Sequence, residues 1–312
     1  MSDGTRGIAV IGDTTVDVYP TGGEPIAPGS AFEWHVGGTA TNAARWAAAL
    51  GGEVSLVTNV GNDVLGAAAA RHLADGPVDA SRVARVDAPS PLTLYTGPDG
   101  DEHWNAWVAG SCYGFTPPTD PASFAAAHEW LLLEGVTLPA EVNGAAVRRL
   151  AAAAAEHGTR VALDLNGRPN QWSGPDAYRD ALRAVLPHCD LLFAGTDDLA
   201  VAGADPTPAG LLGLLPADHD ATAFVTDGGE ATRAVGIVDG EVTERATATP
   251  PSAAVATAAG AGDAFAGAVL AARRGGVSAL AELAAIGNAA GAAAVEAVGA
   301  FDSDAAAALR RG

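Results

Sequence analysis

Lysine is missing from this sequence: all 17 basic side chains are arginines, set against 37 aspartates and glutamates. The formal net charge of −20 gives a surface that repels nucleic-acid phosphates and anionic lipid headgroups, so neither nucleic acid nor membrane is expected as a partner. The simplest interpretation is a solvation adaptation. It would suit a halophilic, salt-rich cytoplasm, where strong screening weakens the repulsion among carboxylates.

Cysteines and long apolar runs are scarce as well. Cys112 and Cys189 lie far apart, with no CxxC or Cys/His cluster near either, which argues against a zinc knuckle or a disulfide framework. No apolar run reaches the roughly 18 residues of a membrane-spanning helix, and the run at 7–12 is too short for the core of a signal peptide. We expect a soluble cytoplasmic protein with reduced thiols.

Aromatic residues make up only 5% of the chain, whereas alanine and glycine are abundant, so the core must be built from small and branched aliphatic side chains. Short β-branched runs alternate with longer alanine-rich segments, the pattern of βα units that build a mostly parallel sheet. The length suits one such domain spanning 1–312. The predicted strands are near 7–11, 54–59, 130–135, 160–164, 190–194 and 222–226, and the predicted helices near 39–50, 63–74, 141–156, 176–186, 262–273 and 279–296.

Two stretches, 14–36 and 91–113, interrupt this alternation. They read as irregular strands with turn signals, such as Pro98-Asp99-Gly100-Asp101, and they hold a large share of the aromatic residues. Packing within a small subdomain explains those aromatics about as well as substrate contact does. A β lid over a site at the carboxyl ends of the parallel strands would explain both.

The most informative segment is a small-residue turn that runs into an apolar helix, Ala258-Ala259-Gly260-Ala261-Gly262-Asp263-Ala264-Phe265-Ala266-Gly267. Backbone N–H groups that converge at a helix N-terminus can bind a phosphate and stabilise its transition-state charge. Asp263 at this anion hole could take a proton from a substrate hydroxyl. The alternative is that Asp263 only complements the helix dipole.

A second group of polar residues follows the first predicted strand. Gly37 and Gly38 permit close approach of the backbone to a ligand, and the amide of Asn42 can both donate to and accept from a polyol. Asp13 and Asp17 supply acceptor oxygens for hydroxyls, although Asp13 could simply cap a turn, and Asn42 could face solvent on a helix start.

Asp164 ends the predicted strand 160–164, and Asn166 and Arg168 follow it. The guanidinium of Arg168 could bind a phosphate or a substrate carboxylate in bidentate fashion, with Asp164 and Asn166 holding either the arginine or the substrate. A surface ion pair between Asp164 and Arg168 is the alternative, and it would contribute little.

The glycine-rich segments that begin at Gly37 and at Gly260 resemble, in chain order, the first and second signatures of the PfkB (ribokinase-like) sugar kinases. The resemblance runs from about residue 7 to about 299, and Asp164-Leu165-Asn166-Gly167-Arg168 is similar to a segment of fructokinase-like and 2-keto-3-deoxygluconate kinase-like members. The segments that resemble the signatures are Gly37-Gly38-Thr39-Ala40-Thr41-Asn42-Ala43-Ala44, followed by Leu50-Gly51-Gly52, and Gly260-Ala261-Gly262-Asp263-Ala264-Phe265, followed by Gly267.

The resemblance implies an α/β, three-layer αβα fold with a mostly parallel central sheet and a small β lid, and ATP and Mg²⁺ as cofactors. It places Asp17 on sugar hydroxyls and Arg168 in the active site. It further implies that Thr226, Gly228 and Gly229 bind the nucleotide, and that Asn288 lines the adenine pocket.

The chain also departs from that family pattern. Thr257-Ala258-Ala259 stands where the family often has Asp-Thr-Thr, and Gly195-Thr196-Asp197-Asp198 stands in place of an Asn-x-x-Glu motif tied to magnesium-bound water. Asp198, or Asp197, remains a candidate to hold the water shell of Mg²⁺.

The expected function is in-line transfer of the γ-phosphoryl group of ATP to a hydroxyl of a small sugar or sugar acid, such as fructose or 2-keto-3-deoxygluconate. Asp263 acts as the base, and Gly260, Ala261 and Gly262 form the anion hole. Two alternatives stay open: a nucleoside kinase that stacks a base on Trp34, Trp104 or Trp107, and a catalytically degenerate binding protein. A homodimer formed through the lid is a further expectation.

Overall fold

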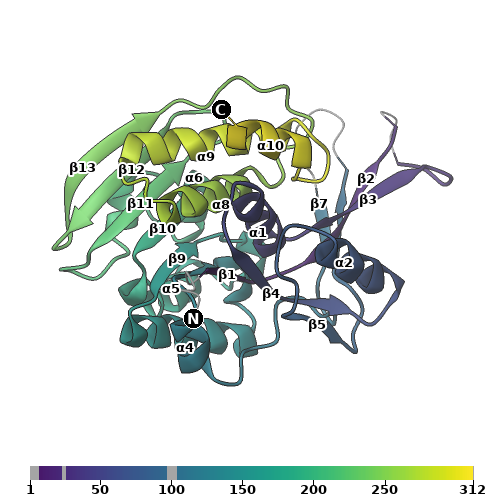
Figure 1. The fold of residues 1–312 in the computed structure, drawn as a ribbon, viewed down its shortest axis with the longest axis horizontal. Helices are drawn as coiled ribbons and strands as arrows, with labels where there is room; N and C mark the ends of the chain where they lie inside the picture. The colour runs from purple at the N-terminus through teal and green to yellow at the C-terminus, as the bar shows by residue number, and fades with distance from the viewer. Residues whose placement is uncertain (1–6, 23–25, 97–103, 312) are drawn as a thin grey trace, which may run out of the picture.

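The main sheet is mostly parallel, as the alternation of segments predicts. The computed structural model describes residues 7–22, 26–96 and 104–311, and within them nine strands form one sheet in the order β13-β12-β11-β10-β9-β8-β1-β4-β5 (Figure 1). The strands are β1 (Ile8–Ile11), β4 (Val54–Gly61), β5 (Val83–Val86), β8 (Trp130–Glu134), β9 (Arg160–Asp164), β10 (Leu191–Gly195), β11 (Ala221–Thr226), β12 (Thr232–Val238) and β13 (Glu241–Ala248).

Within this sheet, the seven neighbouring strands β11, β10, β9, β8, β1, β4 and β5 run parallel. Strands β12 and β13 complete the sheet as an antiparallel hairpin next to β11. In-register pairs such as Ile11 with Leu133, and Glu134 with Asp164, bring the carboxyl ends of adjacent strands together at one edge. In such sheets the crevice outside these ends is where ligands bind.

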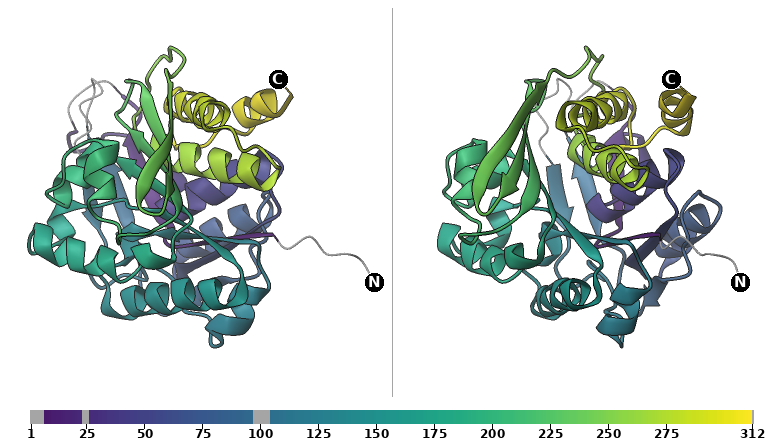
Figure 2. Two further views of the ribbon diagram at one scale, coloured as in Figure 1. Left: turned by 90° about the vertical axis from the view of Figure 1, so that its left-hand side faces the viewer. Right: turned by 60° about the vertical axis from the view of Figure 1, so that its left-hand side comes forward.

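Helices cover both faces of the sheet and so make the expected three layers (Figure 2). One face carries α1 (Thr39–Ala49), α2 (Val64–Ala74), α8 (Ala261–Arg274) and α9 (Leu280–Val295), with α10 (Ser303–Arg311) against α1 and α9. The other face carries α3 (Pro121–Ala126), α4 (Glu141–His157), α5 (Pro175–Arg183), α6 (Thr196–Val201) and α7 (Pro208–Leu212).

Alternate strand residues enter two separate cores, because successive side chains of a strand point to opposite faces. In β1, Ile8 and Val10 pack under α1 and α8, whereas Ala9 and Ile11 pack under α4. Small residues allow close helix contacts: a Cβ on Gly267 of α8 would overlap the backbone of Ala43 in α1. This contact sets the start of α8 beside α1.

The two interrupting stretches form a separate four-stranded sheet in the order β3-β2-β6-β7. Its strands are β2 (Thr15–Pro20), β3 (Phe32–Gly37), β6 (Leu92–Tyr95) and β7 (Trp104–Trp107). Asp17, Thr93 and Ala106 lie side by side on one face, which we call the inner lid face, and Val18 and Trp34 lie on the outer lid face. The turn predicted at 98–101 lies outside the described residues.

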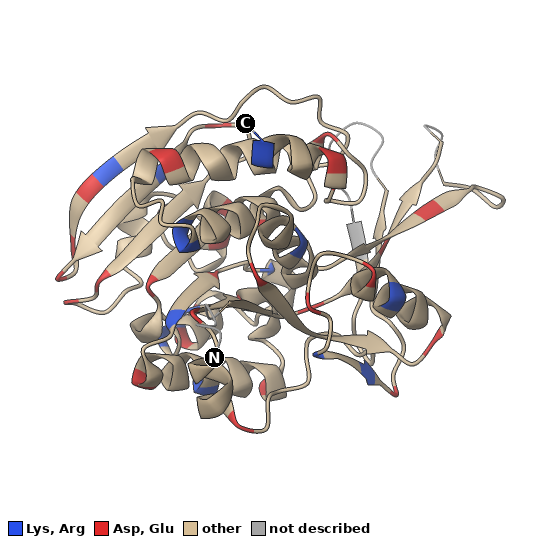
Figure 3. Ribbon diagram, viewed as in Figure 1, with Lys and Arg blue, Asp and Glu red and all other residues tan. Residues whose placement is uncertain are grey.

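The acidic residues are spread over helices, strands and loops rather than gathered on one element (Figure 3). Among the helices that the structure describes, none is both long and apolar enough to span a bilayer.

Candidate active site

A cavity of about 780 Å³ lies at the carboxyl ends of the parallel strands, with the inner lid face on one side. It brings together side chains from the whole length of the chain. Gly37 is not among the lining residues, but it lies against the carboxylate of Asp17. The other predicted site residues all line the cavity: Asp13, Asp17, Gly38, Asn42, Asp164, Asn166, Arg168, Asp198, Thr226, Gly228, Gly229, Gly260, Ala261, Gly262, Asp263 and Asn288.

The predicted anion hole is the N-terminus of α8. Gly260 precedes the helix in the left-handed conformation, with φ of 79°, and no side chain of the described residues caps this end. A Cβ on Gly262 would meet no atom within 4 Å, so the first turn faces open space. Uncapped N–H groups beside an open space are the arrangement that binds an anion.

Asp263 lies in this first turn and is held by a partner from the other end of the sequence. The side-chain amide of Asn42 donates a hydrogen bond of 2.8 Å to Oδ2 of Asp263. Burial raises the pKa of Asp263 to about 6, although the Asn42 hydrogen bond and the charge of Arg168 lower it in part. A carboxylate that titrates near neutral pH, faces a cavity and is fixed in orientation suits a general base better than a residue that only complements a dipole.

The two aspartates after β1 differ in what they contact. Asp13 Oδ1 accepts hydrogen bonds from Thr39 Oγ1 at 2.7 Å and from the Ala40 N–H at 3.3 Å, so Asp13 fixes the start of α1. Asp17 accepts from Thr15 Oγ1 at 2.7 Å. Burial raises the pKa of Asp17 to about 7, with the charges of Asp13 and Asp263 adding to the shift.

Gly38 enables this geometry. Its φ of 100° is strained for any other residue, and a Cβ would lie 2.7 Å from the carbonyl oxygen of Asp13. The glycine pair therefore lets α1 begin directly beside the two aspartates.

Asp164, Asn166 and Arg168 extend from the end of β9 into the same cavity. Asn166 has a positive φ of 43°, and its amide donates to Glu134 Oε2 at 3.4 Å. Burial lowers the pKa of Arg168, but the charges of its neighbours, chiefly Asp198 and Asp263, outweigh this effect. The pKa of the guanidinium is therefore raised. Arg168 thus belongs to the cavity wall, and no ion pair with Asp164 is found among the described residues.

Glu134, which sequence reasoning did not select, lies beside Asp164 and accepts the Asn166 hydrogen bond. It ends β8 next to Asp164, its side chain is fully buried, and its Oε1 has no hydrogen-bond partner among the described residues. Burial and then the charge of Asp164 raise its pKa well above the usual range for glutamate. The available signal was a carboxylate at the end of an apolar run, the same signal that identified Asp164.

The opposite end of the cavity is lined by Thr226, Gly228 and Gly229 after β11, as predicted. Asn288 lines it too, but its amide is engaged in the scaffold. Asn288 Oδ1 accepts from Thr232 Oγ1 at 2.6 Å, and its Nδ2 donates to the Ala248 carbonyl at 2.9 Å. Asn288 therefore holds the β12–β13 hairpin against α9.

Asp198 is also engaged. Its Oδ1 accepts from the Gly167 N–H and its Oδ2 from the Gly195 N–H, both at 2.7 Å. The carboxylate thus joins the start of α6 to the Arg168 segment, while Asp197 lies exposed beside it and lines the cavity. No group of three or more potential metal ligands occurs among the residues that the structure describes.

The predicted aromatic stacking residues lie elsewhere. Trp34 and Trp107 share the outer lid face and do not line the cavity, and the side chain of Trp104 lies outside the described part of the chain. From the lid sheet, the ring of Tyr95 reaches the cavity and stacks on Tyr19 at 4.5 Å between ring centroids. Tyr113, at the end of the 91–113 stretch, lines the cavity as well.

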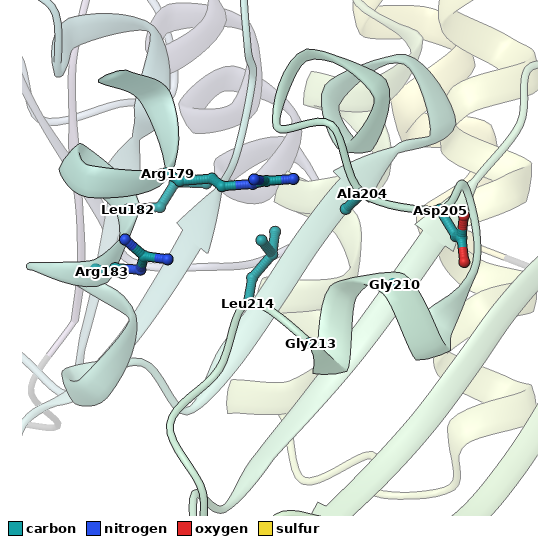
Figure 4. A pocket seen from close by; sticks show the side chains of 8 residues that line it. All are labelled: Arg179, Leu182, Arg183, Ala204, Asp205, Gly210, Gly213 and Leu214. Carbon is teal, nitrogen blue, oxygen red and sulfur yellow. The ribbon is translucent and has the colours of Figure 1, made fainter. Parts of the chain in front are cut away.

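A second, smaller cavity of about 310 Å³ lies between α5 and α7 (Figure 4). Its two arginines are engaged locally: Arg179 donates to the Gly203 carbonyl, and Arg183 pairs with Asp180. None of its lining residues reaches the first cavity.

Comparison with known proteins identifies the family. Residues 5–306 match the model of the pfkB family carbohydrate kinases. A fructokinase of Klebsiella pneumoniae is 30% identical over 268 residues, which cover 85% of this chain and 83% of the relative.

Solved structures agree with the fold. A putative ribokinase II from E. coli in complex with ATP and Mg²⁺ is similar at a TM-score of 0.81 and 20% identity, with 98% of this chain and 99% of that chain covered. A 2-dehydro-3-deoxygluconokinase from Thermotoga maritima is similar at a TM-score of 0.77 and 19% identity, with the same coverage. The chain belongs to the pfkB family of carbohydrate kinases.

Proposed function

We propose that this sugar kinase transfers the γ-phosphoryl group of ATP to a hydroxyl of a small sugar, with Asp263 as the base. The observation that carries the proposal is the position of Asp263, at the open N-terminus of α8 and fixed by Asn42 in one cavity with the sugar-side and nucleotide-side residues. The fructokinase relative makes a hexose such as fructose the first substrate to test.

Each part of the cavity has a role in this proposal. Asp17, Asn42 and Asn166 bind the sugar hydroxyls, and Thr226, Gly228 and Gly229 bind the nucleotide. The N–H groups of Ala261, Gly262 and Asp263 stabilise charge on the transferring group, while Asp263 takes the proton of the attacking hydroxyl. Closure of the lid over the sugar would exclude water and limit ATP hydrolysis.

Of the two candidate aspartates, the exposed Asp197 suits magnesium better than Asp198. Both oxygens of Asp198 accept backbone hydrogen bonds, whereas Asp197 lies exposed at the cavity. Mg²⁺ prefers oxygen ligands and retains several waters, so Asp197 would hold it through its water shell. The ion would neutralise charge on the nucleotide phosphates.

The altered turn before α8 retains a structural function. Thr257 Oγ1 accepts from the Ala259 N–H at 3.2 Å, which helps to shape the turn without a carboxylate or further hydroxyls. We expect the loss of those groups to slow turnover rather than abolish it.

We further propose that the protein forms a homodimer through the outer lid face. Phe32, Trp34 and Trp107 expose 43%, 42% and 56% of their surface there, and Val18 and Leu94 lie between them. A second copy offers the same apolar sheet face, so a two-fold axis would cover both. Light scattering should report a dimer for the wild type and a monomer for Trp34→Glu. A monomeric wild type would contradict this arrangement.

The acidic, lysine-free surface supports a cytoplasm rich in salt as the working environment. We expect activity and thermal stability to increase from low to molar KCl. An optimum at low salt would refute the halophilic interpretation.

The direct test of the function is ADP release with Mg-ATP across fructose, glucose, ribose, 2-keto-3-deoxygluconate and nucleosides. Turnover of a sugar supports the proposal, and turnover of nucleosides alone would replace it with the nucleoside kinase. ATP binding by folded protein with no turnover on any acceptor would indicate a degenerate binding protein.

A further inference from the structure

The charge of the cavity wall carries an inference about which sugars this kinase accepts, and it rests on the proposed function. Six carboxylates line the cavity, and Arg168 is the one cation among its described lining residues. Glu134 adds a fully buried carboxyl behind this wall. The six lining carboxylates belong to Asp13, Asp17, Asp164, Asp197, Asp198 and Asp263.

Arg168 is already balanced by its surroundings. Asp198, Asp263 and Asp164 are close enough for their charges to raise its pKa, and Asp198 accepts the N–H of the adjoining Gly167. A transferring phosphoryl group beside the start of α8 would bind the guanidinium of Arg168 as well. The described lining residues offer no further positively charged side chain for a carboxylate on the sugar.

The lid does not supply that charge either. The inner lid face contributes Thr15, Asp17, Thr93, Tyr95 and Ala106 to the cavity, and Val108, just after β7, also lines it. Ala106 lies next to Thr93, which in turn lies next to Asp17. Among the described lid residues that reach the cavity, none is basic, and one is an acid.

One buried oxygen acceptor of the cavity lining still needs a partner. Asn42 Oδ1 is buried without a hydrogen bond among the described residues. A hydroxyl group of a sugar can donate to this oxygen, whereas a carboxylate only accepts and would be repelled.

We propose that the acceptor site is selective for neutral polyhydroxylated sugars and rejects sugar acids, because six carboxylates line the cavity and a single arginine opposes them among the described lining residues. The chain would thus share its fold with kinases of sugar acids but not their substrate class.

The sharpest comparison uses two substrates that differ at one carbon. 2-Ketogluconate is fructose with the C1 hydroxymethyl group oxidised to a carboxylate, so steady-state kinetics with both isolates the effect of charge. We expect kcat/KM for fructose to exceed that for 2-ketogluconate, and for 2-keto-3-deoxygluconate, by at least about 100-fold, since unmatched like charges in a buried site are strongly repulsive.

A matched pair of lid variants tests the cause. Ala106→Arg places a cation on the inner lid face. It should reduce the ratio of kcat/KM for fructose to kcat/KM for 2-ketogluconate by at least about tenfold. Ala106→Gln, of similar reach but uncharged, should leave the ratio near that of the wild type. Equal narrowing by both variants would overturn the electrostatic explanation.

The outcomes also separate this inference from the proposed function. Efficient turnover of both fructose and 2-ketogluconate, or of 2-ketogluconate alone, would overturn the proposed selectivity. The proposed function as a sugar kinase would not be affected by that result. No turnover of any sugar by folded, ATP-binding protein would overturn the proposed function and this inference with it.

Discussion

Replacing the base Asp263 with asparagine should make the free protein more stable while it removes activity. The amide oxygen of Asp263→Asn can still accept the hydrogen bond from Asn42, so the substitution removes charge with little change in shape. Burial raises the pKa of Asp263 from 3.8 to about 6, so the ionised form is disfavoured in the folded state. This difference corresponds to about 3 kcal/mol at about 1.4 kcal/mol per pKa unit, as an upper value.

The sign of the pH dependence follows from the raised pKa. Because the folded protein binds this proton more tightly than the unfolded chain, the stabilisation from protonation is full below pH 3.8 and is lost as the pH rises through about 6. The advantage of Asp263→Asn over the wild type should therefore be largest above that pH and should disappear toward pH 4.

Thermal or urea unfolding of wild type and variant, in molar KCl at a series of pH values, measures this. For a chain of this size we expect an increase in Tm of up to about 5 °C at pH 8. Asp197→Asn, which removes an exposed carboxylate of the same cavity, is the matched control and should give little change. A variant at Asp263 that is no more stable than this control at pH 8 would refute the assignment of a strained buried carboxylate.

Further predictions follow from the same contacts. At sugar concentrations below KM, kcat/KM should rise with pH through about 6 and then level, because Asp263 must be ionised to accept a proton. A flat profile down to pH 5 would count against Asp263 as the base. Gly38→Ala should destabilise the protein by roughly 1–3 kcal/mol and weaken sugar binding, whereas Gly22→Ala, at an open position of the lid, should be neutral in the same unfolding assay. Asn288→Ala should lower Tm and raise KM for ATP with kcat nearly unchanged, because it releases the β12–β13 hairpin from α9; an unchanged KM would show that the hairpin does not shape the nucleotide end.

The parts of the fold that repeat a strong local pattern were predictable. The six predicted strands and six predicted helices all occur, because apolar β-branched runs and alanine-rich segments, several of them bounded by Gly or Pro, each carry their own signal. The β12–β13 hairpin was missed because its outer strand is half-exposed and rich in Thr, Glu and Arg, so no apolar run marks it. The short helices α3, α6 and α7 were missed because five or six residues are too few to show a helical period.

The candidate site was predictable where a motif is local and not where a role depends on a distant partner. The turn before α8 identified Asp263, but nothing in the sequence pairs it with Asn42, which lies 221 positions away. Likewise, Asp198 and Asn288 were selected as ligands of metal and adenine, and only the folded chain reveals their hydrogen bonds to Gly167, Gly195, Thr232 and Ala248. Glu134 was not selected because no amide or charged side chain follows it closely, whereas Asn166 and Arg168 follow Asp164.

The central claim is that Asp263 serves as the base of a sugar kinase, and one experiment addresses it most directly. ADP release is measured with Mg-ATP and fructose in molar KCl, for the wild type and for Asp263→Asn, together with fructose binding by calorimetry. The account predicts fructose-dependent ADP release by the wild type and a loss of at least about 100-fold in kcat for the variant, with fructose binding retained. Turnover by Asp263→Asn close to that of the wild type would contradict it.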